Sequence, residues 1–149
     1  MIAIVSACLL GIDCRYDGGN VLDERLVKAV RRGDIIPIPV CPEQLSGMPT
    51  PRNRCEIVGG DGFDVLRGRA RVLDEHGRDV TDNFVRGARE VLKIAELVGA
   101  KVAIMKDFSP SCGCGEIYDG TFTGKRRKGF GVTSALLKLS GLKIMGTVL

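Results

Sequence analysis

The sequence predicts an α/β protein built on a mostly parallel sheet. Short apolar runs recur at residues 1–7, 35–40, 101–105 and 143–148, and such runs are typical of strands that are buried on both faces. Stretches with apolar residues at helical spacing lie between them. This alternation of strand and helix favours a parallel sheet with right-handed crossovers.

The early elements follow from turn and capping signals. A helix is expected over residues 23–32, with acidic residues in its first turn and Gly33 available to end it. The strand at 35–40 contains two prolines, which cannot donate to a ladder, so we expect it at a sheet edge or irregular. Residues 47–52 carry two X-Pro bonds and are expected to form a loop.

The longest helix is expected over residues 82–98. Thr81 or Asp82 can serve as its N-cap and Gly99 as its C-cap. Its core stripe comprises Phe84, Ala88, Val91, Leu92, Ala95 and Val98.

The remaining segments give weaker signals. Residues 56–73 contain a turn cluster and a short strand at 69–73, residues 117–122 are compatible with a small hairpin, and a helix is expected over 132–139. With 149 residues and no dividing linker, we expect residues 1–149 to form one domain. The predicted fold is thus a three-layer, Rossmann-like α/β domain with helices on both faces of the sheet.

Composition excludes some partners. Trp is absent and aromatic residues make up only 5% of the chain, so base-stacking platforms are scarce and no nucleic-acid partner is expected. The net charge is +4, and one dense basic run lies at Lys125–Lys128. We favour a solvated loop for this run over a contact with an anionic ligand. No signal peptide or membrane-spanning run is apparent, so we expect a cytoplasmic protein.

Six cysteines in a reducing compartment point to metal binding or redox chemistry. Cys8, Cys41 and Cys112 each follow a predicted strand, at its end or in the loop after it. Because the carboxyl ends of parallel strands meet at one edge of the sheet, we expect these three thiols to converge. The other cysteines, Cys14, Cys55 and Cys114, do not directly follow a strand.

Three converging thiolates are compatible with more than one cofactor. Structural zinc usually has four ligands, often in Cys-x-x-Cys pairs. This sequence contains no such pair. A 4Fe–4S cluster on three cysteines is the other option, and it leaves one iron free to bind a soft ligand such as sulfur.

Two polar residues are expected to line the same place. Glu43 follows Cys41 by two residues and Ser109 precedes Cys112 by three, so either could act in acid–base chemistry. Alternatively, Glu43 is a solvated loop carboxylate and Ser109 a turn cap. The single histidine, His76, is expected in an exposed turn, which disfavours a catalytic Ser-His or Cys-His pair.

Several motifs resemble one known family over nearly the whole chain, the thiouracil desulfurase family. The matching stretches are Val5–Gly11, Cys14–Gly18, Pro39–Glu43, Met48–Arg52, Ser109–Gly113 and Ile117–Gly120.

The resemblance implies a cytoplasmic enzyme with a 4Fe–4S cluster held by Cys8, Cys41 and Cys112, with Glu43 and Ser109 as acid–base candidates. The implied reaction is non-redox removal of sulfur from a thiolated pyrimidine such as 2-thiouracil, whose sulfur binds the open iron. The substrate-binding residues are not indicated. Two other hypotheses stay open: an iron–sulfur or sulfide carrier without turnover, and a redox protein that uses Cys112 and Cys114.

Overall fold

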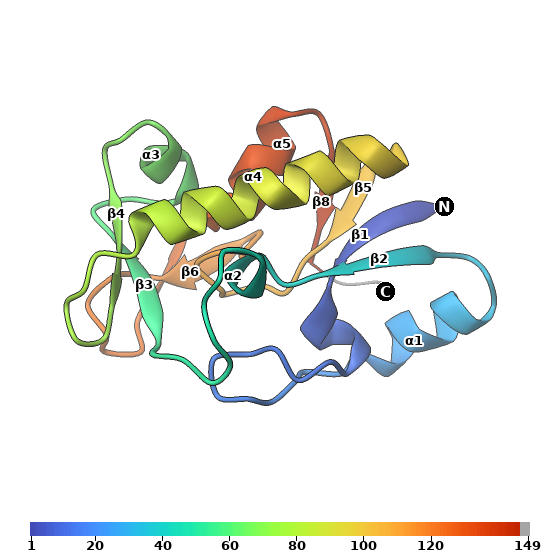
Figure 1. Ribbon diagram of the computed structural model, residues 1–149, viewed down its shortest axis with the longest axis horizontal. Helices are drawn as coiled ribbons and strands as arrows, with labels where there is room; N and C mark the ends of the chain where they lie inside the picture. The colour runs from blue at the N-terminus through green and yellow to red at the C-terminus, as the bar shows by residue number, and fades with distance from the viewer. Residues whose placement is uncertain (147–149) are drawn as a thin grey trace.

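A four-stranded parallel sheet forms the centre of the computed structural model, which describes residues 1–146 (Figure 1). The strand order is β2-β1-β5-β8, and all three pairings are parallel, which confirms the predicted sheet. The chain moves from β1 outward to β2 on one side, and from β5 outward to β8 on the other. A topological switch point therefore lies between β1 and β5, where open α/β sheets bind ligands. The strands are β1 (Ile2–Ser6), β2 (Ile36–Val40), β5 (Val102–Ile104) and β8 (Lys143–Met145).

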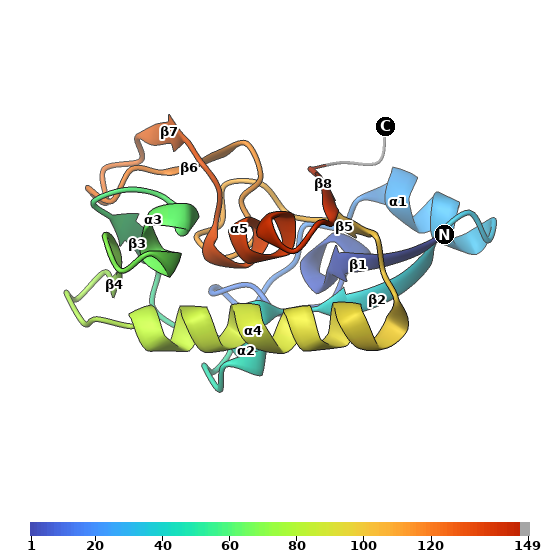
Figure 2. The same ribbon diagram turned by 90° about the horizontal axis from the view of Figure 1, so that it is seen from above.

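Helices cover both faces of this sheet, as predicted. One face packs on α1 (Glu24–Arg31), and the other packs on α4 (Thr81–Val98) and α5 (Val132–Leu139) (Figure 2). Side chains alternate between the faces along each strand. Ala3, Val5 and Ile104 pack with Leu26 of α1, whereas Ile4 and Ala103 pack with Val91 of α4 and Leu137 of α5.

The strand β2 lies at the sheet edge, which confirms the expectation drawn from its prolines. Ile36 N–H donates to the Met1 carbonyl, with N and O 2.7 Å apart. Backbone groups alternate in direction along a strand, so Pro37 and Pro39 present their nitrogens to the outer edge, where no ladder bond is lost.

A second half of the molecule contains two antiparallel ribbons. One pairs β3 (Cys55–Val58) with β4 (Arg71–Asp74) around α3 (Gly62–Leu66), and the other pairs β6 (Glu116–Tyr118) with β7 (Arg126–Lys128). We call residues 52–74 and 116–130 the ribbon half, and the parallel sheet with its connections the sheet half. The core of the ribbon half packs on α4 and α5, where Ile57, Val72 and Ile117 cluster with Phe84 of α4 and Val132 of α5.

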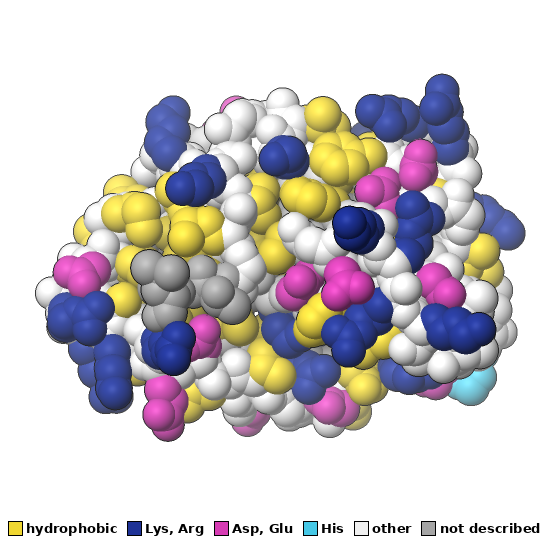
Figure 3. Space-filling model, turned by 180° about the vertical axis from the view of Figure 1, so that it is seen from behind, with side chains coloured by type: hydrophobic (Ala, Val, Ile, Leu, Met, Phe, Trp, Pro, Cys, Tyr) yellow, Lys and Arg dark blue, Asp and Glu magenta, His cyan; other side chains and the backbone are white. Residues whose placement is uncertain are grey.

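The ribbons change two sequence-based expectations. The segment 56–73, which gave only weak signals, supplies β3, α3 and β4. The small hairpin expected within 117–122 is a wider one, because the partner of β6 is residues 126–128. The basic run therefore lies largely on an exposed strand and not in a loop. On the face that carries it, basic side chains are interspersed with acidic ones (Figure 3). Arg127 Nε donates to the Lys128 carbonyl at 3.1 Å.

Helix boundaries deviate slightly from the prediction. Val80 occupies the N-cap position of α4, so the expected cap at Thr81 or Asp82 is wrong. The Thr81 hydroxyl instead accepts from Val72 N–H at 2.9 Å and donates to an Asp79 carboxylate oxygen at 2.6 Å. Gly99 ends the helix with φ 66°, as expected. The last strand covers 143–145, and positions 147 and 148 of the expected strand lie outside the described residues.

Candidate functional site

The carboxyl ends of β1, β2 and β5 open onto one cavity of about 170 Å³. Cys8 reaches it from the 3-10 helix η1 (Ala7–Leu10), directly after β1. Cys41 lies between β2 and the short helix α2 (Pro42–Leu45), and Cys112 lies on the loop after β5. The structure thus brings the three cysteines selected from the sequence to one place.

Two further thiols line the same cavity although neither follows a sheet strand. Cys14 packs with Ala7 and Cys8 and against Cys41, and the Cys41 thiol lies 3.6 Å from the Cys14 carbonyl oxygen. Cys55 begins β3 and reaches the cavity from the ribbon half. The sequence signal for Cys14 was its place in the Cys14–Gly18 stretch, whereas Cys55 had none.

Cys114 does not belong to the cavity lining. Its sulfur lies 3.8 Å from the Met105 carbonyl oxygen, whereas Cys112 is buried and lines the cavity. The structure therefore gives no support to a redox pair made of Cys112 and Cys114.

The pKa values of Cys112, Cys55 and Cys41 are all raised. Desolvation raises the pKa of Cys112 to about 12 and that of Cys55 to about 12. The pKa of Cys41 is raised by its hydrogen bond with the Cys14 thiol and then by burial. Because a thiolate is the metal-binding form, loading a cationic group here must release these protons.

The donor set fits a cluster better than a single ion. Within residues 1–146, no three His, Cys, Asp or Glu side chains gather closely enough to hold one metal ion. The cysteine ligands of a cubane each bind a different iron, so they lie further apart than ligands around one zinc ion. Cys8, Cys41 and Cys112 reach the cavity from three separate strand ends.

Glu43 is held in a buried ion pair at the first turn of α2. Its Oε1 accepts from Arg52 Nε at 3.0 Å, and the side chains are only 13% and 4% exposed, respectively. The same guanidinium donates to the Cys14 carbonyl at 2.9 Å, and its Nη2 lies 4.0 Å from the Cys41 sulfur. Burial opposes the charge of Arg52, but Glu43 outweighs this and raises the pKa of the guanidinium. Arg52 therefore joins the carboxylate to the thiol-bearing loops.

Two serines extend from this carboxylate along the loop after β5. Ser111 Oγ donates to Glu43 Oε2 at 2.9 Å and lies 2.9 Å from Ser109 Oγ. Since the Ser111 proton is used on Glu43, Ser109 donates to Ser111. Ser109 Oγ also accepts from the backbone N–H groups of Ser111 and Cys112, both at 3.1 Å. The predicted pair Glu43 and Ser109 is thus connected through Ser111, which the sequence reasoning missed.

The loop that carries these serines is fixed by Asp107. Its Oδ1 accepts from four backbone N–H groups, those of Phe108, Cys114, Gly115 and Glu116, at 2.9 to 3.2 Å. Burial opposes ionisation of Asp107, but these donors prevail and lower its pKa. Arg126 of β7 lies over the Phe108 ring, 4.2 Å from its centroid, so the second ribbon also braces this loop.

A close backbone contact positions Glu43 and Cys41. A side chain at Gly87 of α4 would collide with the carbonyl of Pro42. The absence of a Cβ therefore allows α2 to approach α4 directly, and this sets the depth at which Cys41 and Glu43 enter the cavity.

His76 lies outside the site, in the exposed turn that the sequence predicts. Its backbone N–H donates to Asp74 at 2.9 Å. The part of the chain that the structure describes also has no helix with the length and apolarity needed to cross a bilayer.

The fold and site define a Rossmann-like α/β protein with a thiol-lined cavity at its switch point. The family described as 2-thiouracil desulfurase matches residues 3–147. The uncharacterised protein YbbK of Bacillus subtilis (strain 168) is 45% identical over 142 residues, which cover 95% of this chain and 93% of that protein. A solved structure of a 4Fe–4S-dependent thiouracil desulfidase, TudS, superposes with a TM-score of 0.81 at 39% identity, covering 96% of this chain and 88% of that one. The chain belongs to the 2-thiouracil desulfurase family, whose enzymes break a carbon–sulfur bond.

Proposed function

We propose that this protein is a 4Fe–4S-dependent enzyme that replaces the sulfur of a thiolated pyrimidine such as 2-thiouracil with oxygen. The observation that carries the proposal is the placement of Cys8, Cys41 and Cys112 around one cavity with Glu43, Ser109 and Ser111. TudS, which has the same fold at 39% identity, is such a desulfidase.

Cys8, Cys41 and Cys112 would hold the cluster. A cluster with three protein ligands supplies one iron that can bind a soft sulfur atom and act as a Lewis acid. The cavity of about 170 Å³ would have to hold the cluster as well, and it is already smaller than the roughly 300–1,000 Å³ of sites for drug-sized ligands, so it favours a small substrate.

The chain's own residues would handle the proton. Water adds to the thiocarbonyl carbon, the carbon–sulfur bond breaks, and the products are the oxo-pyrimidine and hydrogen sulfide, with no net oxidation or reduction. Glu43 is paired with Arg52 and can take a proton from the attacking water, directly or through Ser111, whose hydroxyl Ser109 orients. The same chain can return a proton to the departing sulfur, since both ends open on the cavity.

Anaerobic reconstitution with iron and sulfide tests the proposal. We expect about four iron and four sulfide per chain, followed by equal release of uracil and sulfide from 2-thiouracil, measured by chromatography and a colorimetric sulfide assay. A loaded protein that releases no sulfide from any thiolated pyrimidine would instead be an iron–sulfur or sulfide carrier. A chain that takes up no iron would contradict both.

A further inference from the structure

The ribbon half places a buried carboxylate in the cavity that the proposed chemistry does not use. Glu56 lies on β3, is 5% exposed and lines the cavity. Glutamate is rarely buried to this extent unless it is paired, and burying a carboxylate without partners is costly. The Glu56 carboxylate therefore needs hydrogen-bond donors around it.

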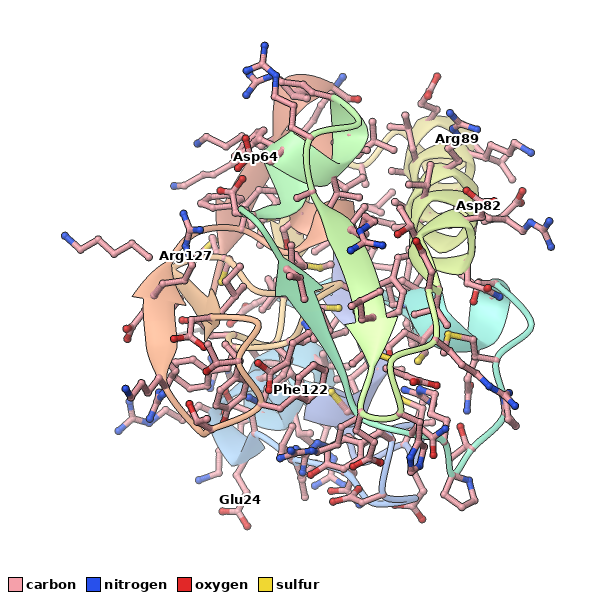
Figure 4. The ribbon with its side chains drawn as sticks, turned by 90° about the vertical axis from the view of Figure 1, so that its left-hand side faces the viewer. Glu24, Asp64, Asp82, Arg89, Phe122 and Arg127 are labelled. Atoms are coloured by element: carbon pink, nitrogen blue, oxygen red, sulfur yellow. The ribbon has the colours of Figure 1, made fainter. Side chains whose placement is uncertain are left out.

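The structure supplies donors to only one of its two oxygens. Oε1 accepts from the backbone N–H of Gly120 at 3.0 Å and from that of Phe122 at 3.1 Å. Both residues belong to the loop between β6 and β7, and Figure 4 shows Phe122 on this loop. One oxygen of Glu56 thus ties the second ribbon to the first.

The other oxygen, Oε2, is open. No described residue donates to it, and no Lys or Arg in residues 1–146 forms an ion pair with Glu56. It is not sealed in the core either, because the one fully buried and unpartnered side-chain oxygen or nitrogen in this part of the chain is Thr133 Oγ1. Since Glu56 lines the cavity, and Oε2 has no donor and is not fully buried, Oε2 is the oxygen available to a ligand there.

We propose that Glu56 Oε2 accepts a hydrogen bond from a ring N–H of the substrate and so selects thiolated bases that keep this N–H free. The inference rests on the proposed function and names a specificity residue of the same site. In 2-thiouracil, the C2=S group is flanked by two ring N–H groups. A buried carboxylate favours such a donor, and it rejects a ring atom that carries a methyl group or a lone pair, because the oxygen is then left unpaired.

The variant Glu56→Gln separates recognition from support of the loop. Its amide oxygen can still accept from Gly120 and Phe122, whereas an NH₂ group replaces Oε2, so an acceptor in the cavity becomes a donor. We expect the affinity of the reconstituted enzyme for 2-thiouracil, measured by titration calorimetry, to fall on the order of ten- to a hundred-fold. Iron content and amide exchange of the 119–123 loop should not change. Glu116→Gln is the matched control, since it removes one exposed carboxylate outside the cavity and should leave the affinity unaltered.

N-methylated substrates provide a second, independent readout. We expect either 1-methyl- or 3-methyl-2-thiouracil to bind the wild-type enzyme on the order of ten-fold or more weakly than the parent base. For that analogue Glu56→Gln should cause no further loss, because the bond is already missing. If the variant does not fold, equal wild-type affinities across this series would still overturn the role of Glu56.

The outcomes separate the two proposals. Unchanged affinity in Glu56→Gln, or equal wild-type affinity for the parent base and both methylated analogues, overturns the role of Glu56 while sulfide release still supports the desulfurase. Binding that depends on Glu56 without any sulfide release supports the recognition role and contradicts the desulfurase. A wild-type enzyme that binds none of these bases contradicts both.

Discussion

The sheet half and the ribbon half contribute to the cavity in different ways. The sheet half brings Cys8, Cys41 and Cys112 to it on the connections that follow parallel strands. The ribbon half contributes Cys55 and Glu56 from an antiparallel pair that lies outside the main sheet. Strand order determines where the three cysteines of the sheet half lie. The positions of Cys55 and Glu56 depend instead on pairing between segments far apart in the sequence. The comparison suggests that the sheet half carries the cofactor and that the ribbon half shapes what may approach it.

The largest expected effect compares one thiol from each half. Cys41→Ala should abolish the cluster and all sulfide release, because it removes one of only three proposed ligands. Cys55→Ala should retain the cluster. Iron and acid-labile sulfide per chain, together with the visible absorbance of the cluster, measure both. A cluster that survives Cys41→Ala but not Cys55→Ala would reverse the assignment of the halves.

The next effect concerns proton transfer in the sheet half. Glu43→Gln should keep the cluster and lower kcat by about 10²- to 10⁴-fold, which is the usual contribution of a positioned acid or base. Ser111→Ala should lower it less, because Ser109 and Glu43 remain in the cavity. Initial rates of sulfide release at matched iron content measure this difference. Wild-type rates in Glu43→Gln would remove it from the mechanism.

A third test breaks the ion pair that crosses between the halves. Arg52→Met leaves Glu43 as a buried carboxylate without its partner, and such losses cost about 3–5 kcal/mol. We expect the free energy of unfolding in urea to fall by that order. The double variant Glu43→Gln with Arg52→Met should regain part of the loss, because no buried charge then remains. A single variant as stable as the wild type would show that the ion pair does not contribute to stability.

The smallest effect is a pH dependence. Asp107 has a pKa below its ordinary value of 3.8, so its contribution to stability is present above that value and is lost as the pH falls through the lower folded-state pKa. Asp107→Asn should therefore show a shallower loss of stability below about pH 4, although it is less stable at neutral pH. Urea midpoints across this range compare the two proteins. Parallel curves would argue against an ionised Asp107 as the brace of the loop.

The contrast between the two halves also explains which features could be predicted from the sequence alone. The parallel sheet, its edge strand and α4 follow from local signals, namely apolar runs, prolines and helical spacing. Cys8, Cys41 and Cys112 could then be selected because all three follow strands. Glu43 and Ser109 lie within three residues of those cysteines, and so they were found too.

Other features needed the folded chain. Arg52 and Ser111 act through contacts with Glu43 that cross 9 and 68 positions of the sequence. Glu56 bonds Gly120 across 64 positions of the sequence, and no local sequence pattern around Glu56 predicts this hydrogen bond. The pairing of β6 with 126–128 was missed for the same reason, because a strand made of Arg and Lys has no apolar alternation to reveal it.

The prolines of β2 have a consequence for how copies of this protein behave toward one another. An exposed strand edge normally offers a row of free amide donors, on which a second chain can add a strand and start aggregation. Along the outer edge of β2, positions 37 and 39 offer none, although Ile36 beside them is 55% exposed. At these two positions, the outer edge of β2 therefore offers an incoming strand no amide donor to pair with.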